Sequence, residues 1–333
     1  MNVIIANLLI LLLFTTGCAQ KQTKIPENWK EIDSVSLLDN NTFKYSLDAF
    51  KKSCVALAKN EPFSSICKNA QKATDAKSFF QDNFVLKPLI PDVKSEYETL
   101  MTGYFEPMLH GSLTQTDRFK YPLYATPKNI ADRTKSRKEI EKGKLLDSPI
   151  CFVDDVLDLY FLQVQGSGRV KLTNGETIFV GYAAQNGHPY TSIGKILTSS
   201  NEIDEDKISL QTIREWVAKY PQKRDWLLHQ NSSYVFFAKE SRGASGSLGV
   251  ELTPEFSIAV DPRFIPMGYP VLLATVHPLT KKPFSRLAMA QDTGGAIKGP
   301  VRADLFWGHG EYAKECAGKM KNDVRLWLLL PKK

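Results

Sequence analysis

The pattern of apolar and polar residues predicts helices in the first hundred residues. In the segment 43–57, apolar side chains recur at three- and four-residue steps, which indicates one buried face of a helix. Asn60-Glu61-Pro62 ends that pattern. A second, shorter helix is expected over 74–84, before Pro88. The N-terminal part of the chain is therefore expected to be helical.

From residue 100 onward, short alternating runs broken by Gly and Pro predict β-strands, the first of them over 100–107. A helix returns once, over 209–220, where Pro221 ends it. The pattern over 234–330 predicts a succession of strands with no helix between them, which favours an all-β barrel.

The segment 158–172 also predicts a strand. On one of its faces Gln163 and Gln165 continue the apolar row of Leu159 and Phe161 towards a Gly-Ser-Gly turn. Hydrogen-bonding amides would then lie at the rim of a sheet. The turn lacks the third glycine of a dinucleotide-binding fingerprint, so no cofactor is predicted there.

The N-terminal residues have the hydropathy pattern of an export signal. Residues 3–16 are almost wholly apolar and uncharged and run into Thr15-Thr16-Gly17-Cys18. The stretch is too short for a comfortable membrane span, and small residues before a cysteine are typical of a bacterial lipoprotein signal. Residues 1–17 are thus predicted to be removed and Cys18 to carry lipid. Ala19 rather than Asp favours the outer membrane, facing the periplasm; the alternative is an N-terminal strand or core helix.

Composition adds a constraint on partners. The 333 residues suffice for about two domains, and 43% hydrophobic residues is ordinary for a globular protein. A net charge of +7 calls for an anionic neighbour. No stretch interleaves aromatic with basic residues as nucleic-acid-binding modules do, so no nucleic acid is predicted. Anionic cell-wall polymer or lipid headgroups fit better.

Four cysteines remain after Cys18, namely Cys54, Cys67, Cys151 and Cys316, and they allow three pairings in an oxidising compartment. A bridge between Cys54 and Cys67 is favoured because they lie close in sequence on adjacent predicted helices. No CxxC occurs, and no cysteine has a zinc-ligand spacing, so no structural zinc is predicted.

Three aspartates occur beside glycine-containing turns at the ends of apolar strands, a pattern that suggests a functional site. They are Asp261, Asp292 and Asp304. Together with His309 they match no familiar metal-ligand spacing, so no metal is predicted.

Asp292-Thr293-Gly294 follows an apolar run, as the catalytic aspartate of an aspartic protease does. Such enzymes need two carboxylates that share a proton, and the second tripeptide is absent. Only a homodimer could complete that dyad. Asp292 can equally brace the turn by accepting backbone N–H groups.

Asp304 lies in a strand among large apolar side chains, within VRADLFW. Desolvation there would raise its pKa, as a general acid working near neutral pH requires. The alternative is a carboxylate at a wet strand edge paired with Arg302, two residues back on the same face.

Five long motifs carry a resemblance, in this order along the chain: QVQGSG, GYAAQNGHPYTSIGK, VFF, DPRFIPMG and DTGGAIKGPVRAD. They are similar in order and spacing to the membrane-bound lytic murein transglycosylase A family, and the last two to its C-terminal three-aspartate domain. The resemblance implies a mainly β fold. A double-psi β-barrel would form from 18–107, which includes the N-terminal helices, together with 230–333. A smaller β-barrel-like domain would be inserted at 108–229, with glycan strands in the groove.

The resemblance also implies roles for residues. Asp304 would be the catalytic acid, with Asp292 and Asp261 in support. The candidates for glycan binding are Tyr104, Glu106, Gln163, Gln165, Gly166, Ser167, Gly168 and Lys298. The expected reaction cleaves the β-1,4 bond between N-acetylmuramic acid and N-acetylglucosamine without water, leaving a 1,6-anhydro end and needing no cofactor. Two alternatives stay open: a non-catalytic peptidoglycan-binding lipoprotein, and a homodimeric aspartic protease that uses Asp292.

Overall fold

The structure is a computed structural model that describes residues 38–91, 97, 99–143, 145 and 149–332. The predicted signal segment and Cys18 lie outside these residues. Among the helices of the described part, none is both long and apolar enough to cross a membrane.

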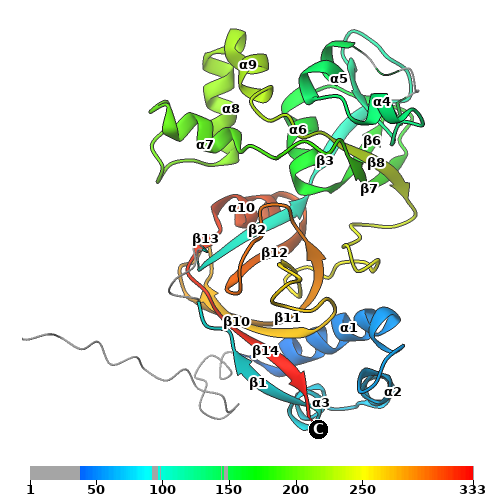
Figure 1. The fold of residues 1–333 in the computed structure, drawn as a ribbon, viewed down its shortest axis with the longest axis vertical. Coiled ribbons are helices and arrows are strands. Elements are labelled where there is room, and N and C mark those ends of the chain that lie inside the picture. Colours follow the sequence, from blue (N-terminus) through cyan, green and yellow to red (C-terminus); the bar gives the residue numbers. More distant parts are fainter. Residues whose placement is uncertain (1–37, 92–96, 98, 144, 146–148, 333) are drawn as a thin grey trace, which may run out of the picture.

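Three helices open the described chain, namely α1 (Asn40–Leu57), α2 (Phe63–Lys72) and α3 (Ala76–Asn83). The helices predicted over 43–57 and 74–84 are confirmed as α1 and α3. The Asp39 side chain caps α1 by accepting the Thr42 N–H. The predicted bridge is also confirmed, because a disulfide between Cys54 and Cys67 joins α1 to α2. The inner faces of these helices form one apolar cluster with β10, β11 and β14 (Figure 1).

The three helices pack on an eight-stranded sheet, and together they belong to the lower unit of the molecule in Figure 1. The order of the strands in this sheet is β1-β14-β10-β11-β9-β12-β2-β13. The strands are β1 (Phe84–Pro88), β2 (Leu100–Glu106), β9 (Ser257–Val260), β10 (Pro270–Val276), β11 (Pro283–Thr293), β12 (Arg302–His309), β13 (Lys321–Asn322) and β14 (Arg325–Pro331). The pairs β2–β12 and β9–β11 are parallel, and the other pairs are antiparallel. Helix α10 (Glu311–Lys319) packs on β2 and β12 and interrupts what the sequence predicted to be wholly β, because Ala313, Cys316 and Ala317 give it a buried face.

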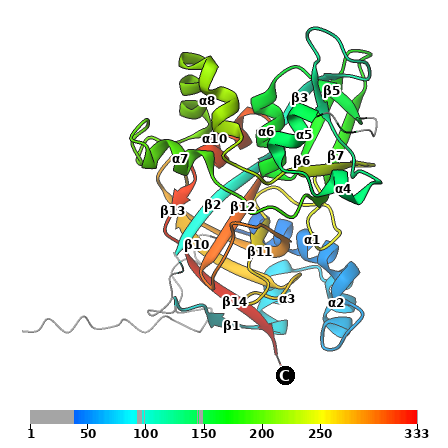
Figure 2. The ribbon, with the colours of Figure 1, turned by 45° about the horizontal axis from the view of Figure 1, so that its top comes forward.

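A six-stranded sheet forms the upper unit, in the order β4-β5-β3-β6-β7-β8 (Figures 1 and 2). Its strands are β3 (Met108–Ser112), β4 (Tyr121–Leu123), β5 (Cys151–Val153), β6 (Ser167–Leu172), β7 (Thr177–Gln185) and β8 (Val235–Glu240). Because β8 pairs with β7, this unit runs to Glu240, beyond the expected boundary at 229.

The upper unit is also richer in helix than the expected small β-barrel. Its helices are α4 (Ile130–Arg133), α5 (Arg137–Gly143), α6 (Val156–Gln165), α7 (Ile193–Ser199), α8 (Leu210–Lys219), the 3-10 turn η2 (Pro221–Lys223) and α9 (Arg224–Leu228). The predicted helix over 209–220 is confirmed as α8. Helices α6 to α9 share a second apolar cluster, which gives the helical part of the unit a core of its own.

The strand predicted over 158–172 is wrong in its first half, which is helix α6. The Asp155 side chain accepts the Leu157 and Asp158 N–H groups at its start, and Gly166, with φ +81°, ends it in the left-handed conformation. Consequently Gln163 and Gln165 do not share one face of a strand. They sit on the last turn of a helix that ends at the Gly-Ser-Gly turn.

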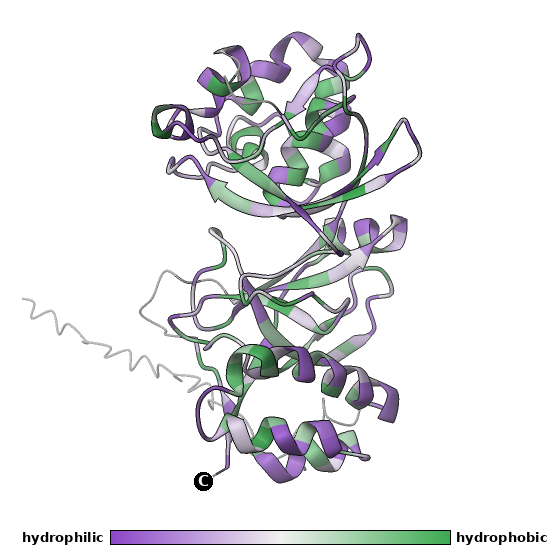
Figure 3. Ribbon diagram, turned by 90° about the vertical axis from the view of Figure 1, so that its right-hand side faces the viewer, coloured by the Kyte–Doolittle hydropathy of each residue, from purple (hydrophilic) through white to green (hydrophobic). Residues whose placement is uncertain are grey.

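Two chain crossings join the units. Pro107 links β2 to β3, and the segment 241–256 leads from β8 back to β9. Figure 3 shows the two sheets one above the other, with these crossings at the junction. The overall architecture is thus a mixed, sheet-rich fold with N-terminal helices and two sheets that meet across a junction.

Candidate active site

Asp304 lies on β12, between β2 and β9. It is the register partner of Thr102 in the parallel pair with β2 and of Ala259 in the antiparallel pair with β9. The Thr102 hydroxyl lies 2.7 Å from Asp304 Oδ1. Gly103, next along β2, leaves room for the Trp307 ring and for α10, because a Cβ there would meet Trp307 Nε1 at 2.7 Å and Ala317 Cα at 3.0 Å.

The environment of Asp304 favours its neutral form. Burial raises the pKa of Asp304 from 3.8 to about 6, while Arg302 and the Thr102 hydrogen bond lower it and Asp292 raises it slightly. Both features that the sequence suggested are therefore present, the desolvation and the same-face Arg302. Desolvation is the larger effect, so the carboxyl is poised near neutral pH.

Asp292 lies near the end of β11 with both carboxylate oxygens occupied. Its Oδ1 accepts the Ser247 and Thr293 N–H groups, each at 2.9 Å, and its Oδ2 accepts the Tyr104 hydroxyl at 3.0 Å. These are hydrogen bonds of the kind that the brace interpretation predicts, although they tie β11 to the 241–256 crossing as well as to its own turn. Burial raises the pKa of Asp292, and the same hydrogen bonds oppose that rise.

Asp261 is buried away from these two aspartates, in a different setting. Its carboxylate binds Arg263 in a forked ion pair and accepts the Gly299 N–H at 3.0 Å. The Arg263 hydrogen bond is the main reason that the pKa of Asp261 lies well below its usual range. Neither Asp261 nor the exposed Lys298 lines the pocket described next.

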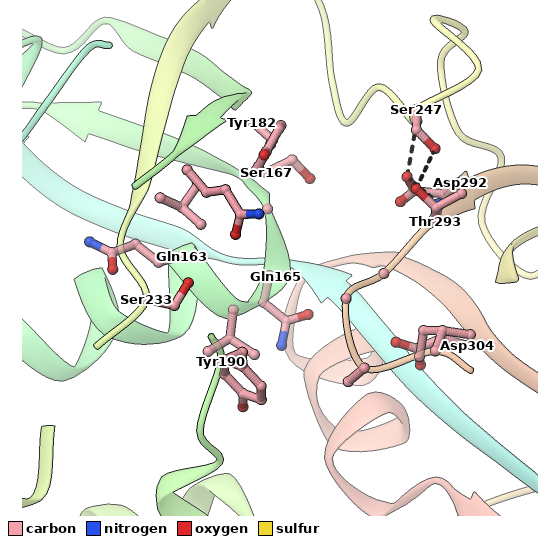
Figure 4. Close-up of a pocket in the computed structure, with 18 of the residues that line it drawn as sticks. Gln163, Gln165, Ser167, Tyr182, Tyr190, Ser233, Ser247, Asp292, Thr293 and Asp304 are labelled. Carbon is pink, nitrogen blue, oxygen red and sulfur yellow. Dashed lines mark hydrogen bonds between the residues drawn. The ribbon is translucent and has the colours of Figure 1, made fainter. Parts of the chain in front are cut away.

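A pocket of about 500 Å³ opens between the two units (Figure 4). The lower unit supplies Asp292, Arg302, Asp304 and the glycine turn after β11. The upper unit supplies the end of α6, the turn that follows it, and Tyr182 on β7. Figure 4 shows Asp292 and Asp304 on one side of the pocket and the glutamines and tyrosines on the other.

The two glutamines of α6 are held by their carbonyl oxygens. Gln165 Oε1 accepts the Phe105 N–H at 3.0 Å, and Gln163 Oε1 accepts Arg137 Nη2 at 2.6 Å. A backbone N–H and a guanidinium can only donate, so the amide orientation is fixed in both. The Gln165 NH₂ group is thereby left to donate to a ligand in the pocket.

The other predicted glycan-binding residues divide into two groups. Gly166 and Ser167 line the pocket. Tyr104 is buried and donates its hydroxyl to Asp292. Glu106 is buried in an ion pair with Arg169, with 2.9 Å between Oε2 and Nε. Gly168 does not line the pocket and packs against Leu162 and Pro107. Tyr104 and Glu106 therefore hold neighbouring side chains in place and do not line the pocket themselves.

Sequence reasoning missed several pocket residues. Tyr182 and Tyr190 are 54% and 45% exposed and line the pocket, which makes their rings accessible to a ligand. Both lie within GYAAQNGHPYTSIGK, so the motif contained the signal. Thr102 and Arg137 carry no local signal, because their partners are distant in sequence.

Within the described residues, no three His, Cys, Asp or Glu side chains are grouped so as to hold a metal ion. The pocket offers one carboxyl whose pKa is raised to about 6, a second carboxylate held in hydrogen bonds, and several amide and hydroxyl donors. A carboxyl with a raised pKa in a pocket that also offers hydrogen-bond donors is an arrangement that enzymes acting on glycosidic bonds use for their general acid.

Comparisons with known proteins show to which family of carbohydrate-cleaving proteins the chain is similar. Residues 100–238 match the MltA specific insert domain, and residues 256–330 match the 3D domain. Membrane-bound lytic murein transglycosylase A of Escherichia coli K12 is 37% identical over 238 residues, 68% of this chain and 64% of that protein. Its homolog from Buchnera aphidicola is 36% identical over 241 residues, 69% of this chain and 65% of that protein. The chain belongs to the membrane-bound lytic murein transglycosylase A family, and the match spans just under two thirds of the length of each relative.

Solved structures of the family are similar to this fold. The Agrobacterium tumefaciens membrane-bound lytic murein transglycosylase superposes with a TM-score of 0.82 at 27% identity, covering 92% of this chain and 97% of that chain. For MltA from Neisseria gonorrhoeae the TM-score is 0.76 at 32% identity, covering 87% and 88%. For Escherichia coli MltA with bound chitohexaose it is 0.72 at 28% identity, covering 88% and 90%.

Proposed function

We propose that this protein is a lytic murein transglycosylase that cleaves the β-1,4 bond between N-acetylmuramic acid and N-acetylglucosamine in peptidoglycan. The observation that carries the proposal is Asp304, a carboxyl with a pKa of about 6 in the pocket between the units. Family membership supports the substrate class, as does the relative that binds chitohexaose, a chain of N-acetylglucosamine.

The reaction we propose needs one acid. Neutral Asp304 gives its proton to the glycosidic oxygen as that oxygen leaves C1 of the muramyl residue. The Asp304 carboxylate then accepts the proton of the muramyl C6 hydroxyl, whose oxygen closes onto C1. The product is a 1,6-anhydromuramic acid end, no water is consumed, and Asp304 is again neutral.

Asp292 supports this single-acid scheme by being engaged elsewhere. Hydrolases need a second carboxylate, free to act as nucleophile or to activate water. Both Asp292 oxygens already accept hydrogen bonds from Ser247, Thr293 and Tyr104. The same hydrogen bonds argue against a homodimeric aspartic protease, in which Asp292 would share a proton with its copy.

Positive charge develops at C1 in the transition state, and the scheme also needs groups that orient the glycan. The Gln165 NH₂ group and Ser167, at the start of β6, are suited to hydrogen-bond sugar hydroxyl and acetamido groups. We assign Gln163 and Gly166 to their support, and Tyr104 to the support of Asp292. We assign Asp261 to structural support of the loop that carries Gly299.

Two finer points belong to this proposal. We propose that the eight-stranded sheet has the double-psi arrangement, because its parallel pairs β2–β12 and β9–β11 join strands that are not consecutive in sequence. We also propose a lipid anchor at Cys18 that holds the protein to the outer membrane, facing the periplasm. Replacing Cys18→Ala should release the protein from membrane fractions, and a variant that stays membrane-bound would rule the anchor out.

The decisive experiment compares the wild type with Asp304→Asn on purified murein sacculi. The variant should keep its fold and its murein binding but lose turnover by a factor on the order of 10²–10⁴, because the amide cannot transfer the proton. The wild type should release 1,6-anhydromuropeptides, and its rate should fall on the alkaline side as Asp304 ionises. Reducing muramic acid ends would indicate a hydrolase, and no product at all would favour a non-catalytic murein-binding lipoprotein. Full activity in Asp304→Asn would refute the role of Asp304.

A further inference from the structure

The Thr102 hydroxyl contacts two charged side chains at once. Thr102 is the register partner of Asp304 across the parallel strands β2 and β12, so both side chains lie on the same face of the sheet. Its Oγ1 accepts a hydrogen bond from Arg302 Nη2 at 2.9 Å and lies 2.7 Å from Asp304 Oδ1. Thr102 therefore lies between the cation and the acid.

Counting donors fixes the direction of both contacts. A guanidinium can only donate, and a threonine hydroxyl has a single hydrogen. Arg302 uses one lone pair of Oγ1 and leaves the threonine hydrogen available. In the ionised form of Asp304 the carboxylate can only accept, so this hydrogen points to Oδ1. Arg302 is itself buried and pinned by the Ala303 carbonyl oxygen at 2.5 Å, so this arrangement cannot easily reverse.

This direction selects one oxygen of the acid. While the Thr102 hydrogen points to Oδ1, a second hydrogen does not fit in the 2.7 Å gap between Oγ1 and Oδ1, so an incoming proton is directed to Oδ2. We propose that Thr102 is a positioning residue that reserves Oδ2 of Asp304 as the proton-carrying atom, an inference that rests on the proposed transglycosylase reaction.

The proton then follows a defined path. In the first step the Oδ2–H bond breaks and the glycosidic oxygen gains the proton, while Thr102 stabilises the negative charge left on Oδ1. In the second step Oδ2 takes the proton of the C6 hydroxyl. Without the threonine hydroxyl, the proton would divide between the two oxygens, and only one of them could reach the bond.

Other charged or titratable groups act on Asp304 as well. They are Arg302 on its own strand, Asp292 on β11 and Tyr104 on β2, while β9 contributes only Ala259. Among these groups Arg302 also contacts Thr102, so Thr102→Val removes an acceptor of Arg302 Nη2 together with the hydroxyl that Asp304 uses, whereas Thr102→Ser keeps both contacts and serves as the control.

The test compares Thr102→Val, which keeps the shape and removes the hydroxyl, with Thr102→Ser, which keeps the hydroxyl. Thr102→Val should lower kcat by about 10- to 100-fold, the effect of losing a hydrogen bond to a charged group, with KM changed by less than about twofold. Its alkaline limb should move to higher pH, because the lost hydrogen bond had favoured the carboxylate. Thr102→Ser should match the wild type in both respects. If Thr102→Val disturbs the fold by circular dichroism, Thr102→Ala carries the same expectation.

A second measurement does not depend on turnover. A ¹³C NMR titration of the Asp304 carboxyl, assigned by its absence in Asp304→Asn, should give a higher pKa in Thr102→Val and an unchanged pKa in Thr102→Ser. An unmoved pKa with wild-type kcat in Thr102→Val would overturn the proposal, as would a Thr102→Ser variant as impaired as Thr102→Val. A wild type that forms no anhydro ends would instead refute the proposed function, while the titration would still decide the role of Thr102.

Discussion

The raised pKa of Asp304 predicts that this residue destabilises the protein at neutral pH. A pKa raised from 3.8 to about 6 means that the fold favours the neutral acid. At about 1.4 kcal/mol per pKa unit, the ionised form costs about 3 kcal/mol as an upper limit. Because the pocket is open to water, we expect roughly 1–3 kcal/mol.

Asparagine resembles the neutral acid and can still accept the Thr102 hydrogen bond. Asp304→Asn should therefore raise the free energy of unfolding at pH 8 by that amount. The gain should shrink as the pH falls through 6 and vanish below about 3.8, where Asp304 is neutral in the folded and the unfolded chain. Urea unfolding followed by tryptophan fluorescence, at several pH values, measures this directly.

Asp261 supplies a matched control with the opposite sign. The pKa of its carboxyl lies well below the usual range because of Arg263. Asp261→Asn should thus lower stability at pH 8, and the loss should fade only below the usual pKa of an aspartate, as the pH falls towards the lowered pKa of Asp261 in the folded state. Equal stability of wild type and Asp304→Asn at pH 8, or a gain that is as large at pH 4 as at pH 8, would refute the desolvation argument.

Two further predictions concern the scaffold. Asp292→Asn should lower the free energy of unfolding by about 1–3 kcal/mol, because the amide keeps one oxygen for the Ser247 and Thr293 N–H groups but loses the negative charge and turns an NH₂ group towards the Tyr104 hydroxyl, which now donates to Asp292. Cleavage should fall with it, and loss of all cleavage with unchanged stability and binding would instead make Asp292 directly catalytic. Replacing Cys54 and Cys67 together by alanine should lower stability by about 2–4 kcal/mol, since the bridge closes a short loop. Activity should survive at moderate temperature, and an unchanged urea midpoint would contradict this estimate.

Local pattern predicted much of the fold and failed where an element is buried on more than one side. Helix α1 was predictable because only one of its faces is apolar. Helix α6 was not, because Leu159 and Leu162 pack into the cluster of the six-stranded sheet, while Leu157 and Tyr160 pack into the helical cluster. With both sides apolar, the 3.6-residue period is hidden and only the caps at Asp155 and Gly166 distinguish a helix from a strand.

The candidate site was predictable to a similar degree. Asp304 stood out because its neighbours on the strand are large and apolar, and this local fact also determines its desolvation. Thr102 could not be found in this way, since the contact with Asp304 joins residues 202 positions apart. The same holds for Arg137, whose guanidinium orients Gln163 from another helix. A contact of this kind depends on strand register or helix packing, which single-sequence periodicity does not contain.

The parallel pairing of β2 with β12 also constrains the order in which the molecule can assemble. Strand β2 is complete at Glu106, but its partner begins only at Arg302, so this contact forms late in folding. The upper unit lies between them in sequence and has apolar clusters of its own, so it can collapse first. Until β12 is in place, a growing chain has the upper side of the pocket but neither Asp304 nor the buried environment that raises its pKa. Under the proposed function, an unfinished molecule would therefore lack its catalytic acid.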